Sequence, residues 1–65
     1  MTKHEFENLK TGDLLKSKFS IFIFIDAWIV KSKRAPYYVT YHFDIRKACM
    51  VYLNLYEPWK YFIKI

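Results

Sequence analysis

The chain has 65 residues, 54% of them hydrophobic and 22% aromatic, and eleven Lys or Arg against six Asp or Glu give it a formal charge of +5. This length predicts a single domain, residues 1–65, with a small core, because so short a chain buries only about 60% of the surface that it exposes when unfolded. One cysteine, Cys49, excludes an intrachain disulfide, and its spacing from His4 and His42 is unlike that of a zinc site, so we expect no metal, no cofactor and a core of aromatic side chains.

The first expected element is a short helix from Lys3 to about Lys10. Thr2 and Glu5 have the spacing of a capping box, in which each side chain accepts a hydrogen bond from a free backbone amide. We expect Gly12, the only glycine, to end the helix, because glycine tolerates positive φ. The alternative is a frayed terminus, since a helix this short is marginal alone. No apolar segment typical of a secretory signal occurs here, so we expect a cytoplasmic protein.

The composition then changes to β-branched and aromatic residues, which predicts strands from Leu14 to Phe19 and from Ile21 to Val30. The second run is too short for a membrane-spanning helix, which needs about twenty apolar residues, and Asp26 interrupts it. We expect no membrane partner. Both parities of this strand are apolar, so both of its faces need cover. We expect Asp26 to mark a bulge or bend.

A turn at Lys31 to Pro36 predicts an antiparallel hairpin, because proline fixes φ and cannot donate to a ladder. The next strand, Tyr37 to Asp44, has two unlike faces. One holds Tyr37, Val39, Tyr41 and Phe43, and the other, more polar face holds Tyr38, Thr40, His42 and Asp44. We expect His42 at the surface or partly packed.

The segment from Ile45 to Leu55 fits two structures. We favour a turn at Asp44 to Lys47 and a strand from Ala48 to Leu55, because the strand pattern alternates cleanly and matches its β-rich neighbours. Cys49 then faces inward as a buried thiol. The alternative is a helix over 45–55. A last strand is expected from Trp59 to Ile65.

Five short strands after a small helix predict a mostly β fold, a small five-stranded antiparallel barrel with a short amino-terminal helix, because closure removes exposed strand edges. The alternative, with a helix at 45–55, is an α+β fold.

The segment Leu9-Lys10-Thr11-Gly12-Asp13-Leu14-Leu15-Lys16 resembles the approach to the first strand of small SH3-like barrels, in which a Gly-Asp turn precedes the strand. The order of elements that follows is similar, and the composition resembles that of small bacteriophage proteins. The resemblance implies an adaptor that binds nucleic acid or protein, in some phage versions a host enzyme that it inhibits or redirects. The loop at Lys31 to Arg34 departs from SH3 domains that bind proline-rich peptides, because it is basic where theirs is acidic.

Catalytic chemistry is not expected. A nucleophile needs an adjacent histidine with an orienting group, and neither Cys49 nor His42 has such a partner in the predicted strands. One glycine cannot form a phosphate-binding loop. We therefore expect a protein that is not an enzyme.

The leading functional hypothesis is a non-enzymatic protein-binding module, which the resemblance implies is phage-encoded, whose aromatic surface binds and inhibits or redirects a host protein or binds a second copy of the chain. Six aromatic residues fall on the parities taken as outward: Phe22, Phe24, Trp28, Tyr38, Tyr52 and Phe62. Aromatic side chains with a basic rim are typical of a binding surface. The predicted contacts are Trp28, Lys31, Lys33, Arg34, Tyr38 and Tyr52.

Two alternatives stay open. In the first, Lys16, Lys18, Lys60 and Lys64 share one face of neighbouring first and last strands and bind nucleic acid, while Tyr38, Tyr52 and Phe62 stack on bases. In the second, weaker alternative, the chain forms a homo-oligomer through Ile21 to Val30.

Overall fold

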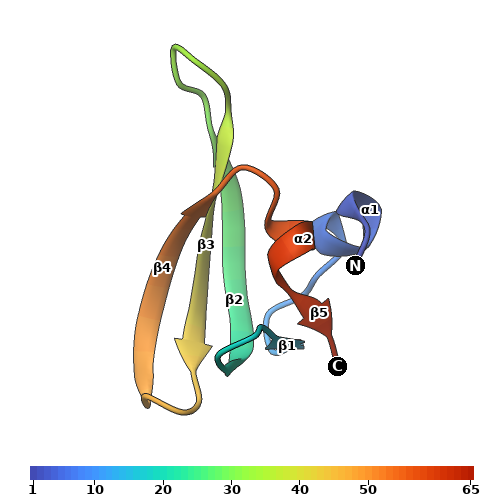
Figure 1. Cartoon of the computed structure of the whole chain (residues 1–65), viewed down its shortest axis with the longest axis vertical. Coiled ribbons are helices and arrows are strands. Elements are labelled where there is room, and N and C mark those ends of the chain that lie inside the picture. The colour runs from blue at the N-terminus through green and yellow to red at the C-terminus, as the bar shows by residue number, and fades with distance from the viewer.

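A computed structural model gives the structure of residues 1–65, and it contains one five-stranded antiparallel sheet in the order β4-β3-β2-β1-β5 (Figure 1). The elements are α1 Lys3–Glu7, β1 Leu14–Lys16, β2 Ile21–Val30, β3 Tyr37–Asp44, β4 Cys49–Leu55, α2 Pro58–Tyr61 and β5 Ile63–Lys64. The predicted mostly β, barrel-like fold with a short amino-terminal helix is confirmed. The helical alternative for 45–55 is wrong. β4 and β5 are the two ends of the sheet, so no ladder closes the barrel.

The capping box of α1 is confirmed. Glu5 N donates to Thr2 Oγ1 at 3.1 Å, and Thr2 N donates to Glu5 Oε1 at 2.9 Å. The bond from the Thr2 amide holds the pKa of Glu5 below its ordinary value. The helix ends at Glu7, earlier than expected, and Gly12 belongs to the turn before β1, where it has a φ of +101° and donates to Phe24 O.

The bulge predicted at Asp26 is confirmed, because the β2–β3 register shifts between Phe24 and Asp26. Thr11 donates its hydroxyl to Ile25 O at 2.6 Å, and this bond ties the bulge to the turn before β1. A bulge adds one residue to one strand, so the side-chain alternation reverses beyond it. Phe24 and Trp28 have the same parity, yet the reversal places them on opposite faces of the sheet.

The core lies between the sheet and the two helices, on what we call the inner face. Phe6, Leu15, Phe22, Phe24 and Phe62 are its buried hydrophobic residues. Phe6 packs edge-on against Phe24, with ring centroids 6.3 Å apart, and Phe22 packs edge-on against Phe62 at 5.7 Å. The prediction that Phe22, Phe24 and Phe62 face outward is therefore wrong.

The more polar side of β3 is also the buried side, because it faces the core. Thr40, His42 and Asp44 are all buried. His42 lies between Phe22, at a centroid distance of 4.6 Å, and Phe62, at 5.3 Å. The expectation that His42 lies at the surface or is partly packed is wrong, because Phe62 packs over its ring from the opposite side of the core.

The predicted last strand is also wrong in its first half. Pro58 stands in the first turn of α2, where its fixed φ suits a helix and its missing amide costs no hydrogen bond. Only Ile63 and Lys64 form a strand, β5, which pairs with β1 as expected for neighbouring first and last strands. β1 ends at Lys16 and not at Phe19. Cys49, expected to be buried, is exposed at the start of β4.

Neither helix is long and apolar enough to cross a membrane, since α1 has five residues and α2 has four.

Candidate functional site

The candidate site is the side of the sheet opposite the core, which we call the outer face. No helix covers it, because Phe6 of α1 and Trp59 of α2 both pack against Tyr38 on the inner face. The strand registers place fifteen residues on this side: Leu14, Lys16, Ile21, Ile23, Asp26, Trp28, Val30, Tyr37, Val39, Tyr41, Phe43, Met50, Tyr52, Asn54 and Ile63.

An aromatic cluster of Trp28, Tyr41 and Tyr52 occupies the middle of the outer face. Tyr41 and Tyr52 face each other across β3 and β4 and stack, with ring centroids 4.2 Å apart and planes at 22°. Trp28 meets Tyr52 edge-on at 6.4 Å. Tyr52 is 62% exposed and Trp28 is 42% exposed, so the cluster is open to solvent. Partial desolvation, and then the neighbouring Tyr41, raise the pKa of Tyr52 above its ordinary value.

Mostly apolar side chains extend the outer face around this cluster. One row across the sheet consists of Leu14, Ile23, Phe43 and Met50, and the next includes Lys16, Ile21 and Ile63. An antiparallel sheet with one solvated face ordinarily alternates apolar and polar residues, with the polar ones outward. Here most residues of the outer face are apolar, and Lys16, Asp26 and Asn54 are the exceptions besides the tyrosine hydroxyls.

A basic loop borders the outer face at one end. Lys31, Lys33 and Arg34 are exposed in the connection between β2 and β3, which projects beyond the rest of the sheet (Figure 1). Neither salt bridge of the chain involves them. Ser32 Oγ accepts from Ala35 N at 3.3 Å and donates to Ala35 O, which orders the loop. The loop therefore presents three free cations next to an apolar surface.

The structure brings together most of the residues predicted for a protein interface. Trp28 and Tyr52 are in contact, and Lys31, Lys33 and Arg34 lie in the loop that follows β2, the strand of Trp28. Tyr38 does not belong with them, because it is half-buried on the inner face between Phe6 and Trp59. Sequence reasoning missed Tyr41, Phe43 and Met50, although the alternation of β3 had already put Tyr41 and Phe43 on one face.

The four lysines of the nucleic-acid hypothesis do not gather on one face. Lys16 is on the outer face, whereas Lys64 pairs with Leu15 of the inner face and lies 3.8 Å from Asp13 Oδ2. Lys60 belongs to α2 and forms an ion pair with Glu57 at 2.8 Å. Lys18 lies in the β1–β2 turn over the ring of Phe19. Of the residues proposed to stack on bases, Phe62 belongs to the core and Tyr38 packs against the core, so neither is free on the outer face.

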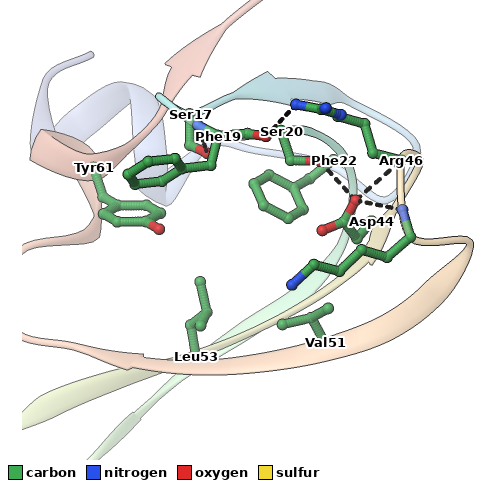
Figure 2. Close-up of a pocket in the computed structure, with 10 residues that line it drawn as sticks. Ser17, Phe19, Ser20, Phe22, Asp44, Arg46, Val51, Leu53 and Tyr61 are labelled. Carbon is green, nitrogen blue, oxygen red and sulfur yellow. Dashed lines mark hydrogen bonds between the residues drawn. The ribbon is translucent and has the colours of Figure 1, made fainter.

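A second feature is a pocket of about 540 Å³ at the open side of the barrel, between β4, α2 and the β1–β2 turn (Figure 2). Phe22, Val51, Leu53 and Tyr61 line its apolar side. Arg46 donates from its guanidinium to Phe19 O at 2.9 Å, which ties the β3–β4 turn to the β1–β2 turn at the pocket's rim.

Asp44, the buried carboxylate of this pocket, binds groups of the chain itself through one of its two oxygens. Asp44 Oδ1 accepts from Ser20 Oγ at 2.6 Å, from Arg46 N at 2.9 Å and from Lys47 N at 3.1 Å. The Ser20 bond, and then the two backbone amides, hold the pKa of Asp44 below its ordinary value. These groups bind one another and hold two turns together, which is a structural role.

His42 completes no catalytic arrangement with them. Both of its ring nitrogens are buried without a hydrogen-bond partner, and Ser20 donates to Asp44 and not to His42. Burial, opposed by the charge of Asp44, lowers the pKa of His42. His42 is therefore held neutral. That the chain is not an enzyme stays a prediction.

Comparison of the chain with protein-family models, with curated proteins and with solved structures found no match.

Proposed function

We propose that the chain is a non-enzymatic protein-binding module that docks a partner protein on its outer face. The observation that carries this proposal is an exposed aromatic cluster inside an apolar sheet face that no element of the chain covers. Large exposed apolar patches on small proteins are typical of interaction sites, and Trp and Tyr are enriched among the residues that dominate binding energy.

The basic loop adds a requirement on the partner. Cations at the rim of an interface steer association and select partners with complementary charge more than they add affinity. The partner should therefore combine an apolar centre with an acidic border that reaches Lys31, Lys33 and Arg34.

The kind of partner is part of the same proposal and has a different basis. The resemblance of the Leu9 to Lys16 segment and of the composition to small phage proteins supports a host protein as the partner, one that is inhibited or redirected in the cytoplasm. The comparisons with known proteins give this part of the proposal no further support.

Affinity purification from the host with matched variants tests the proposal. Trp28→Ser combined with Tyr52→Ser removes the exposed part of the aromatic cluster, while Phe19→Ser removes an aromatic side chain that is 69% exposed in a turn away from it. The wild type and Phe19→Ser should retain the same partner, and the double variant should lose it with an unchanged circular dichroism spectrum. Retention by the folded double variant would refute the proposal.

Nuclease treatment of the same samples separates the nucleic-acid hypothesis. A bound protein that survives the nuclease supports direct protein binding. Loss of all bound material after nuclease, with affinity falling steeply in salt, would favour the nucleic-acid alternative.

A further inference from the structure

β4 is an edge strand whose outer side is open. It pairs only with β3, and in Figure 1 it forms the margin of the sheet with no segment beyond it. An edge strand presents unpaired backbone donors and acceptors, which pair readily with another strand.

β4 has none of the devices that usually protect such an edge. Its sequence, Cys49-Met50-Val51-Tyr52-Leu53-Asn54-Leu55, contains no charged residue and no proline. Its register with β3 runs without a bulge over all seven pairs. The other edge, β5, is only two residues long and includes Lys64, which is the ordinary protected form.

The ladder fixes which amides of β4 point to the open side. Ile45 N donates to Ile21 O at 3.0 Å, so the pairs in phase with it along β2 and β3, such as Ile23 with Phe43, are the hydrogen-bonded ones. The backbone groups of successive residues point to opposite sides of a strand, so those of His42, next to Phe43, point toward β4 and pair with Val51. The backbone groups of Met50, Tyr52 and Asn54 are left pointing away from the sheet.

We infer that a second copy of this chain occupies the open edge, with its own β4 antiparallel to the first and the twofold axis at Tyr52. Residue numbers that face each other in this register sum to 104, so Met50 faces Asn54 of the second copy and Val51 faces its Leu53. Tyr52 meets Tyr52, and both residues direct their amide and carbonyl groups to the shared edge. The outer faces of the two copies then form one continuous surface.

Charge also favours a second copy in this register. Each copy carries a charge of +5, but the two meet along a strand that has no charge. The strand ladder itself ends at Cys49 and Leu55, but the same register brings Lys47, in the turn before β4, and Glu57 of the second copy, just after its β4, to the same end of the interface, and the twofold axis repeats this at the other end. Lys47 is exposed and in neither salt bridge of the chain, and Glu57 holds only the exposed Lys60.

The inference rests on the strand edge and not on the proposed function, and the two can fail separately. A variant that no longer self-associates but retains its partner protein would leave the proposed function standing. A dimer without any bound partner would leave the edge pairing standing.

Charge reversal tests the register by sedimentation equilibrium at low salt. Lys47→Glu and Glu57→Lys each place like charges at both ends of the interface, and we expect each to weaken self-association by about tenfold or more, because two exposed pairs change from attraction to repulsion. An equal mixture of the two variants restores both pairs between unlike chains, and should associate as strongly as the wild type. Both chains remain positively charged, so net charge cannot produce the rescue.

Amide hydrogen exchange tests the edge at the level of the backbone. The amides of Met50, Tyr52 and Asn54 should become at least tenfold more protected as concentration rises through self-association, whereas those of Val51 and Leu53, bonded to β3, should be protected throughout. A wild-type chain that stays monomeric at about 1 mM, where even a weak complex is half formed, would overturn the inference. So would a mixture that associates no better than its single variants, or protection that ignores the parity of β4.

Discussion

The two faces of one sheet show opposite relations between polarity and burial. On the inner face of β3, Thr40, His42 and Asp44 are all buried, His42 against Phe62 and Asp44 against Ser20 of the β1–β2 turn. On the outer face, Trp28, Met50 and Tyr52 are exposed. Burial in this small chain therefore follows the side of the sheet on which the helices lie, although that side of β3 is the more polar one. We interpret the inner face as the source of stability and the outer face as the source of binding.

The largest expected effect is on the inner face. Phe62→Ala removes a fully buried ring that contacts both Phe22 and His42. A truncation of this kind costs about 3 to 5 kcal/mol, a large part of the roughly 3 to 10 kcal/mol expected for a domain of this length. Urea denaturation should show a largely unfolded variant. A variant as stable as the wild type would mean that the helices do not cover a true core.

A substitution at His42 is expected to raise the free energy of unfolding, whereas Phe62→Ala lowers it. His42→Leu replaces two unpartnered buried nitrogens by an apolar side chain of similar size, and should raise the free energy of unfolding by about 1 to 2 kcal/mol near neutral pH. His4→Leu, at an exposed position of α1, is the matched control and should change little.

The buried His42 should also make the stability of the chain depend on pH. Because burial lowers the folded-state pKa of His42, the unfolded chain binds the proton first, so stability is complete above about pH 6.5 and falls as pH decreases toward the folded pKa. Asp44, whose pKa is also lowered, adds a second loss at more acidic pH, below about 3.9. Denaturation curves of His42→Leu should lack the first loss and keep the second. A wild-type stability that is flat from pH 7 to pH 5 would contradict the buried neutral histidine.

A smaller effect is expected at the polar link between the turns. Ser20→Ala removes one of three donors to the buried Asp44 carboxylate, and should lower the free energy of unfolding by about 1 kcal/mol. The loss should be greatest near neutral pH and should shrink in acid, where Asp44 is protonated. A loss that stays constant across that range would argue against the charge-assisted bond.

The smallest effect is expected on the outer face. Met50→Thr changes a residue that is 43% exposed and keeps good β propensity, so the free energy of unfolding should change by no more than about 0.5 kcal/mol. Equilibrium denaturation beside Phe62→Ala gives the contrast between the faces directly. A cost above about 2 kcal/mol would place Met50 in the folding core and erase the distinction.

Elements set by local patterns could be predicted from the sequence. The bounds of β2 and β3, the capping box at Thr2 and Glu5 and the bulge at Asp26 all depend on short-range spacing. The pairing of the first and last strands is a long-range contact, and it was predictable only from the expected barrel-like fold.

Errors arose where one local event changed the long-range order. Strict alternation along Ile21 to Val30 puts Phe22 and Phe24 on the same side as Trp28, whereas the bulge at Asp26 reverses the side-chain parity and separates them. Trp59 to Phe62 alternates well enough to look like a strand, and only Pro58, in the first turn of α2, indicates a helix. A predicted fold without α2 has nothing to cover the inner face, and it therefore does not predict that His42 and Phe62 are buried.

Hydroxyl-radical footprinting of the free and partner-bound chain tests the central claim most directly. It reports the solvent exposure of Met, Trp, Tyr and Phe side chains in the wild-type sequence, so no substitution is needed. In the free chain, Trp28, Met50 and Tyr52 should be labelled and the buried Phe62 should not. In the complex, labelling of those three should fall sharply, while Phe19, away from the outer face, should label as before. Continued labelling of Trp28, Met50 and Tyr52 in the bound state would show that the partner binds elsewhere and would contradict the account.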